Sequence, residues 1–262
     1  MPTLEELKTS VLEDGIVDAD EAAAIKAEIY SEDGDEGARV SRAEADMLFD
    51  INTATSGKEN DPAWKEVFVE GITNHVLGDE ASPGAVDADE YTYLKEKIGE
   101  DGVVDDNEMA LLVNITDKAE SCTDDFNTYV MESLKARVLE DGIIDADEVA
   151  QIRTVIYGSG GGDGEGVSRE EADFMFALND AVSGKENDAG WKDLFVEAIA
   201  KHVLEDETSP GVVDEDEAKW LVDAVKGDDQ YDDAELALFS KIKTDATDVH
   251  ETLTFQFDLM NV

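Results

Sequence analysis

Apolar side chains recur three and four positions apart along most of the chain, and charged or polar residues fill the positions between them. The spacing is clearest in four segments of the first half, AAAIKAEIY (22–30), EADMLFDIN (44–52), WKEVFVEGITNHVL (64–77) and EMALLVNI (108–115). It places one apolar stripe along each helix. Strand signals are confined to short pairs such as Ile16-Val17 and Val103-Val104. The pattern therefore predicts an all-α fold of short amphipathic helices.

The pattern repeats at an offset of 127 residues, with no gap needed between about residues 9 and 120. VLEDGIVDADEAAAIKAEIY (11–30) returns as VLEDGIIDADEVAQIRTVIY (138–157), and SGKENDPAWKEVFVE (56–70) returns as SGKENDAGWKDLFVE (183–197). We therefore expect two tandem homologous halves of about six short helices each, over 1–122 and 138–262, joined by a helix over 123–140.

Glycine and proline mark several helix ends. Gly57 and Gly184 stand where the end of a helix needs a left-handed residue. Asp61 before Pro62 predicts an N-cap followed by proline in the first turn. Trp64 and Trp191 occupy equivalent positions inside apolar helices, so both are expected in the core.

One local device recurs four times in each half: an aliphatic or aromatic residue, Asp or Ser, two further residues, and Glu. The copies run Val17-Asp18-Glu21, Val40-Ser41-Glu44, Val86-Asp87-Glu90, Val104-Asp105-Glu108, Ile144-Asp145-Glu148, Val167-Ser168-Glu171, Val213-Asp214-Glu217 and Tyr231-Asp232-Glu235. Asp or Ser followed three residues later by Glu is a capping box, in which each side chain accepts the other residue's backbone N–H. On this interpretation the device stabilises helix starts and binds nothing.

The same strings also resemble the back half of an EF-hand calcium loop. Such a loop has Gly at position 6, an aliphatic residue at 8, a donor at 9 and a bidentate Glu at 12. In DGIVDADE these positions fall on Gly15, Val17, Asp18 and Glu21, with Asp14 at position 5. The front half does not fit, because position 1 falls on Ser10, and in the other Asp-Gly copies on Arg137, Lys97 or Ala224.

Three other stretches supply a fuller set of oxygen ligands, and the strongest are 79–90 and 206–217. The candidate ligands are Asp79, Asp87 and Glu90 in 79–90, Asp206, Thr208, Asp214 and Glu217 in 206–217, and Asp33, Asp35, Ser41 and Glu44 in 33–44. Because each stretch has only a few oxygen ligands, the predicted calcium dissociation constants are roughly 10⁻⁴–10⁻³ M.

The Asp-Gly segments LEDGIVDADEAAAI and EDGVVDDNEMALL are similar to those of the TerB-like tellurite-resistance proteins. The resemblance covers about a tenth of the chain. It implies an all-helical domain with an acidic surface that binds divalent cations near such turns. The implied ligands are Asp14, Asp18, Glu21, Asp101, Asp105, Glu108 and, in the second half, Asp141, Asp145 and Glu148. The last copy departs from the pattern, with Asp229 in place of Gly102.

Charge narrows the choice of partners. The chain has 67 acidic residues against 20 basic ones, a formal net charge of −47. Nucleic acid and anionic membrane surfaces are disfavoured, because binding phosphate needs clustered Lys and Arg. Self-repulsion at this density opposes compaction unless cations relieve it. The charge therefore favours divalent cations, or a basic or amphipathic protein, as partners.

Other features exclude several classes of protein. Cys122 is the only cysteine, so there is no intramolecular disulfide and no thiolate metal site. The start, MPTLEELKTS, lacks a signal region, and no apolar run is long enough to cross a membrane, so we expect a cytoplasmic protein. No nucleophile elbow, Cys-His pair or phosphate-binding loop occurs, so no enzyme is predicted.

Two functional hypotheses remain. The first is a non-enzymatic protein that binds Ca²⁺, or Mg²⁺ or another divalent cation, at acidic turns as a buffer, a sensor or a calcium-stabilised element. The second is an acidic scaffold or interaction protein, adapted to salt or to a basic partner, whose turns are capping boxes without a specific metal site.

Overall fold

Helices form where the apolar stripes predict them, in a computed structural model that describes residues 3–30, 39–99, 104–158, 166–205, 209–225, 231–260 and 262. The protein is mostly helical, and the all-α prediction is confirmed. Five of the predicted ligands, Asp33, Asp35, Asp101, Asp206 and Thr208, lie outside the described residues.

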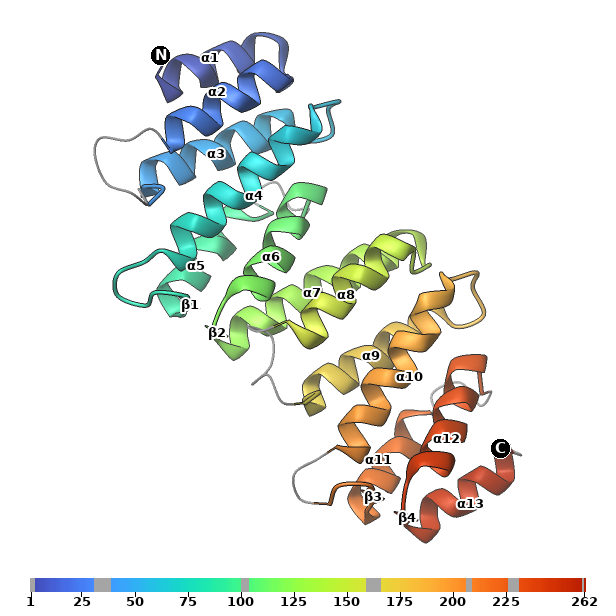
Figure 1. The fold of residues 1–262 in the computed structure, drawn as a ribbon. Helices are drawn as coiled ribbons and strands as arrows, with labels where there is room; N and C mark the ends of the chain where they lie inside the picture. The colour runs from blue at the N-terminus through green and yellow to red at the C-terminus, as the bar shows by residue number, and fades with distance from the viewer. Residues whose placement is uncertain are drawn as a thin grey trace. The chain divides into compact units, whose positions relative to one another are not determined.

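The chain divides into two compact units, Met1–Val130 and Met131–Val262. The first contains α1 (Leu4–Asp14), α2 (Ala19–Ile29), α3 (Arg42–Thr55), α4 (Pro62–Leu77), β1 (Ala85–Val86), α5 (Ala88–Lys97), α6 (Asp106–Lys118) and β2 (Ser121–Cys122). Helix α7 (Asp124–Asp141) begins in the first unit and ends in the second (Figure 1).

The second unit continues with α8 (Ala146–Tyr157), α9 (Arg169–Val182), α10 (Ala189–Leu204), β3 (Val212–Val213), α11 (Glu215–Ala224), α12 (Asp233–Asp245), β4 (Asp248–Val249) and α13 (Glu251–Met260). Each of these elements begins 127 residues after an element of the same type in the run from α2 to α7, as Ala146 follows Ala19 and Glu251 follows Asp124. The element boundaries therefore follow the offset of the sequence repeat.

A central helix organises the core of each unit. In the first unit α4 packs against α2, α3 and α6, and Trp64 and Phe68 are fully buried. In the second unit α10 takes the same role against α8, α9 and α12, with Trp191 and Phe195 buried. The expectation that both tryptophans belong to the core is confirmed.

The strands are not where the short apolar pairs placed them. β1 pairs with β2 in parallel, Val86 opposite Cys122, and β3 pairs with β4 in the same way. Ile16-Val17 forms no strand, and Val103 lies outside the described residues. Val17 is instead fixed by one loop, since its N–H donates to Asn60 Oδ1 (2.9 Å) and its carbonyl accepts the Asp61 N–H (2.8 Å).

Predicted helix ends are confirmed at two kinds of position. Gly57 and Gly184 have φ of 70° and 71°, in the left-handed region that favours glycine. Asp61 caps α4, because its Oδ1 accepts the Ala63 N–H, and Pro62 occupies the first turn. These local signals fix where α4 begins, and α4 carries much of the first unit's core.

Candidate functional site

All eight Asp/Ser-x-x-Glu pairs form reciprocal capping boxes. In each, the Asp or Ser side chain accepts the backbone N–H of Glu, and the Glu carboxylate accepts the backbone N–H of Asp or Ser. The boxes are Asp18–Glu21, Ser41–Glu44, Asp87–Glu90, Asp105–Glu108, Asp145–Glu148, Ser168–Glu171, Asp214–Glu217 and Asp232–Glu235. The side chains predicted as calcium ligands at positions 9 and 12 thus bond to the backbone of their own helix.

The Asp-Gly turns use their aspartates to close the turn. Gly15 is left-handed (φ 76°), and its N–H donates to the carbonyl of Val11 (2.8 Å). Asp14 Oδ1 accepts the Ile16 N–H (3.1 Å), and Ser10, at loop position 1, donates its hydroxyl to Glu21 Oε1 (2.8 Å). Backbone and hydroxyl donors therefore occupy oxygens that the cation hypothesis assigns to calcium.

The second unit repeats this turn. Gly142 has φ of 72°, and its N–H donates to Val138 O (2.9 Å). Asp141 Oδ1 accepts the Ile143 N–H at 3.0 Å, as Asp14 does with Ile16. Asp145 and Glu148 form the box that follows.

Asp105 accepts four hydrogen bonds from described residues, more than a helix cap alone requires. Its Oδ1 accepts the backbone N–H groups of Asn107 and Glu108, both at 2.9 Å. Its Oδ2 accepts Asn52 Nδ2 (3.0 Å) and Ser56 Oγ (2.8 Å), which reach it from α3 and the residue after it. With four donors on two oxygens, Asp105 ties the end of α3 to the start of α6.

Asp232 has the same arrangement, with Asn179 Nδ2 at 2.8 Å and Ser183 Oγ at 3.1 Å on its Oδ2. The two units differ in which group donates a hydrogen bond to the Oδ1 atom of Asn52 or Asn179. Trp191 Nε1 donates to Asn179 Oδ1 (3.2 Å). In the first unit Asn107 Nδ2 donates to Asn52 Oδ1 (2.8 Å), and Trp64 Nε1 is buried without an acceptor among the described residues. Residue 234 is alanine where residue 107 is asparagine.

Asn107→Ala is therefore expected to stabilise the first unit. It frees Asn52 Oδ1 to accept Trp64 Nε1, as the second unit does, and we expect a gain of about 1 kcal/mol in the free energy of unfolding. Urea denaturation measures it. Ala234→Asn is the reciprocal variant and should destabilise the second unit. A loss of stability in Asn107→Ala would contradict this assignment.

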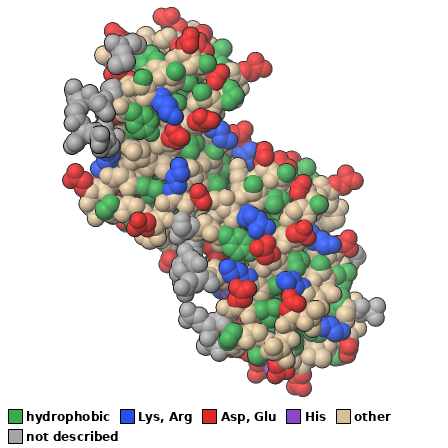
Figure 2. Space-filling view, in the orientation of Figure 1, with side chains coloured by type: hydrophobic (Ala, Val, Ile, Leu, Met, Phe, Trp, Pro, Cys, Tyr) green, Lys and Arg blue, Asp and Glu red, His purple; other side chains and the backbone are tan. Residues whose placement is uncertain are grey.

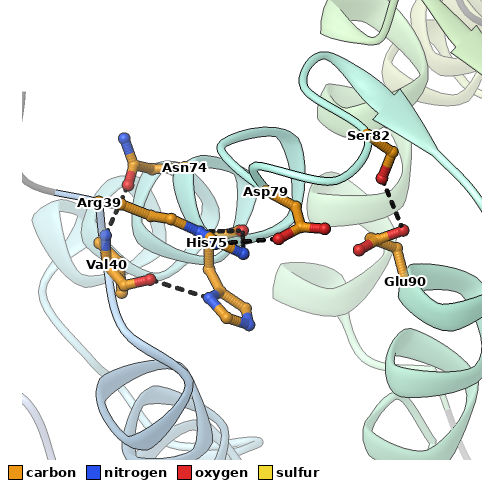
Figure 3. Close-up of polar contacts among 7 residues, drawn as sticks. All are labelled: Arg39, Val40, Asn74, His75, Asp79, Ser82 and Glu90. Carbon is orange, nitrogen blue, oxygen red and sulfur yellow. Dashed lines mark hydrogen bonds and ion pairs between the residues drawn. The ribbon is translucent and has the colours of Figure 1, made fainter.

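In loop 79–90 the first and last candidate ligands have different partners (Figure 3). Asp79 Oδ1 lies 3.0 Å from Arg39 Nη1, and Arg39 also donates to the carbonyl of His75. Glu90 Oε2 accepts Ser82 Oγ and the Asp87 N–H, both at 3.3 Å. A guanidinium thus holds the carboxylate at position 1, and the hydroxyl of Ser82 binds the carboxylate at position 12.

Asp87 and Glu90 influence each other's protonation. The hydrogen bond from Glu90 lowers the pKa of Asp87, and burial followed by the neighbouring Asp87 raises the pKa of Glu90. The opposite directions mean that the last proton of the pair stays on Glu90. Because these two carboxyl groups are hydrogen-bonded to each other, they form the part of loop 79–90 best suited to a cation.

Loop 206–217 of the second unit has no equivalent of Arg39, the residue that holds Asp79 in the first unit. Gly166 occupies the place equivalent to Arg39. Asp214 and Glu217 form their capping box, with both backbone N–H bonds at 2.9 Å, and Asp206 and Thr208 lie outside the described residues.

Ser41 and Glu44 also form a capping box, and the segment before them is held by α4. Val40 N–H donates to Asn74 Oδ1 (2.7 Å), and His75 Nδ1 donates to the Val40 carbonyl (2.8 Å). Burial lowers the pKa of His75, so the ring is neutral. His75 therefore fixes the entry to α3, a role that sequence spacing alone did not indicate.

Glu148 is a buried box glutamate whose charge is costly. It is 8% exposed, and burial raises its pKa. Its Oε2 accepts the Asp145 N–H at 3.0 Å, a bond that glutamine can also accept. Glu21 is the equivalent residue of the first unit, where the side chain is half-buried.

Glu148→Gln is expected to raise the melting temperature by about 2 °C at pH 7. A carboxyl with a raised folded-state pKa stabilises the fold when protonated, and that contribution is lost as pH rises above about 4.3. The advantage of the variant should therefore vanish near pH 4. Melting curves between pH 4 and pH 8 test this, with Glu21→Gln as the matched control. Equal gains in both variants would exclude burial as the cause.

Within the described residues, no group of three or more His, Cys, Asp and Glu side chains is placed to hold a metal ion together. Burial raises the pKa of the Cys122 thiol to about 12, so the thiol is protonated at neutral pH. In the same part of the chain no helix is long and apolar enough to cross a membrane.

The comparisons with known proteins add no relative. No family model, no curated protein and no solved structure matches this chain.

Proposed function

We propose that this protein is a non-enzymatic, acidic helical scaffold that binds a basic protein partner through its surface charge. The observation that carries the proposal is the use of the turn carboxylates: in all eight boxes they accept backbone N–H groups of their own helix. Their hydrogen-bonding capacity serves the fold, while their negative charge still acts at long range.

The charge itself supports a basic partner. The formal net charge is −47, and Asp and Glu side chains lie over helices of both units on the face in Figure 2. A surface of one sign attracts partners of the other sign and accelerates their association. We further propose that the units are copies of one ancestral unit, supported by the 127-residue offset of their elements.

Binding of a fluorescent peptide made of Lys and Ser tests the proposal. We expect binding at about 0.05 M NaCl and an affinity that falls steeply toward about 0.3 M, because such attraction is screened over the Debye length. A Glu/Ser peptide of equal length is the control. No binding of the Lys/Ser peptide at low salt would refute the proposal.

A second candidate function rests on the Asp87–Glu90 pair: weak calcium binding in loop 79–90. Asp87, Glu90 and Ser82 bring three oxygen-bearing side chains to one end of the loop, and Asp79 is held in an ion pair with Arg39. Arg39 therefore competes with a cation for the first ligand of the loop.

Arg39→Gly, which copies the second unit, is expected to strengthen any calcium response. If the variant binds calcium with a dissociation constant of about 1 mM, about 5 mM CaCl₂ should raise its free energy of unfolding by about 1 kcal/mol. The measurement is the melting temperature in CaCl₂ against NaCl of equal ionic strength. Glu90→Gln in the same background should abolish the difference. Identical responses to both salts in every variant would exclude calcium binding in this loop.

A further inference from the structure

Helix α13 has an apolar outer face that its own unit does not bury. Phe255 is 65% exposed and Leu259 59% exposed, and their i, i+4 spacing places them on one side of the helix. The inner face is separate, with Leu253, Phe257 and Met260 buried. We name Phe255 and Leu259 the α13 patch.

The equivalent helix, α7, shows that packing does not require these side chains. In α7 the buried residues Phe126 and Val130 correspond to Leu253 and Phe257. The exposed positions that correspond to Phe255 and Leu259 are Thr128 and Glu132. The inner face is therefore apolar in both helices, whereas the two outer positions are apolar in α13 and polar in α7.

The charged side chains of α13 itself are acidic. α13 contains Glu251 and Asp258, both exposed, and neither lysine nor arginine. It packs against α11 and α12, where Lys219 is paired with Glu215 at 2.6 Å and Lys243 donates to the carbonyl of Val262. An occupant of this face must therefore offer apolar side chains flanked by positive charge.

We propose that the α13 patch docks a basic amphipathic segment of a partner protein. The inference rests on the proposed function and adds the place where the partner's apolar side chains bind. Charge opposes a second copy of this chain as the occupant, because two molecules of net charge −47 repel each other and α13 would face its own carboxylates. A basic amphipathic helix satisfies both requirements, with leucines on Phe255 and Leu259 and lysines beside Glu251 and Asp258.

The test compares two fluorescent peptides at about 0.15 M NaCl. One is a Leu/Lys peptide of about 14 residues with helical spacing of leucine, and the other is a Lys/Ser peptide of equal charge. The double variant Phe255→Thr/Leu259→Glu reproduces the α7 residues. It should bind the Leu/Lys peptide at least about tenfold more weakly and the Lys/Ser peptide no more weakly than the wild type.

The direction in which the double variant changes peptide affinity distinguishes docking on α13 from attraction by charge. Leu259→Glu adds a negative charge, so attraction alone predicts equal or tighter binding of both peptides. Undiminished binding of the Leu/Lys peptide would overturn the proposal and leave the acidic scaffold intact. Failure of both peptides to bind the wild type would overturn both. Sedimentation that shows a dimer dissolved by the double variant would assign the patch to a second copy and also overturn it.

A measurement on the wild type covers the case in which the variant unfolds. A Leu/Lys peptide that carries one benzophenone at a leucine position is irradiated with the full chain, and the cross-linked residues are located by mass spectrometry. Cross-links on α13 support docking there. Cross-links confined to other helices would overturn it.

Discussion

Raising NaCl from about 0.05 M to about 1 M is expected to raise the melting temperature by about 10 °C, because the Debye length shrinks to about 3 Å. The chain has 67 acidic and 20 basic residues, so most carboxylates have no basic side chain to pair with. Several of its ion pairs are well exposed, such as Lys26–Glu70 and Arg153–Glu197, and lose little when screened. Relief of repulsion therefore exceeds the loss of attraction.

Differential scanning calorimetry over this salt range measures the effect. KCl should act like NaCl, and sucrose, which carries no charge, should not reproduce the steep rise at low salt. A melting temperature that stays constant or falls with salt would show that repulsion between carboxylates does not limit stability.

Asp105→Ala is expected to destabilise the first unit by about 3 kcal/mol. The loss combines the helix cap with two side-chain donors, Asn52 Nδ2 and Ser56 Oγ, left without their acceptor. Asp18→Ala is the matched control, because Asp18 accepts the Glu21 N–H at the start of α2 (2.8 Å) without side-chain donors of this kind in the described contacts. We expect it to cost about 1 kcal/mol, typical of an N-cap.

Tryptophan fluorescence can isolate the first unit in this experiment. The chain has 3 tryptophans, and Trp64 is the one in the first unit. In a Trp191→Phe/Trp220→Phe background only Trp64 fluoresces as tryptophan. Urea denaturation then reports the first unit, which contains the sites of Asp105→Ala and Asp18→Ala. Equal losses in the two variants would mean that the contacts from Asn52 and Ser56 contribute nothing beyond the cap.

Local chemistry made the helix starts predictable. Asp87 followed by Glu90, or Ser41 followed by Glu44, closes a capping box with atoms from four consecutive residues, so no long-range information is needed. Among the described residues the pattern missed the box Thr3–Glu6, because its first residue is threonine and no aliphatic residue precedes it. Gly57 and Pro62 were predictable for the same reason, since glycine tolerates a positive φ and the proline ring fixes φ near the helical value.

Contacts between distant segments were beyond such local reasoning. Arg39 reaches Asp79 across 40 positions, and Asn52 reaches Asp105 across 53. Both pairings decide whether a carboxylate is available to a cation, and neither leaves a mark in the spacing of acidic residues. The parallel pairing of β1 with β2 likewise joins distant segments, Ala85–Val86 and Ser121–Cys122, whereas the apolar pair Ile16-Val17 forms no strand.

Helix α7 runs without a break from Asp124 to Asp141, although the units meet between Val130 and Met131. A protease cut, or a gene fragment ended at that junction, would sever a hydrogen-bonded ladder and create a new end with four carbonyls and a new start with four N–H groups lacking partners. Unfolding of the first unit would fray α7 from its N-terminal end, and unfolding of the second unit would fray it from its C-terminal end. Melting of the whole chain should therefore be more cooperative than melting of two pieces cut within α7.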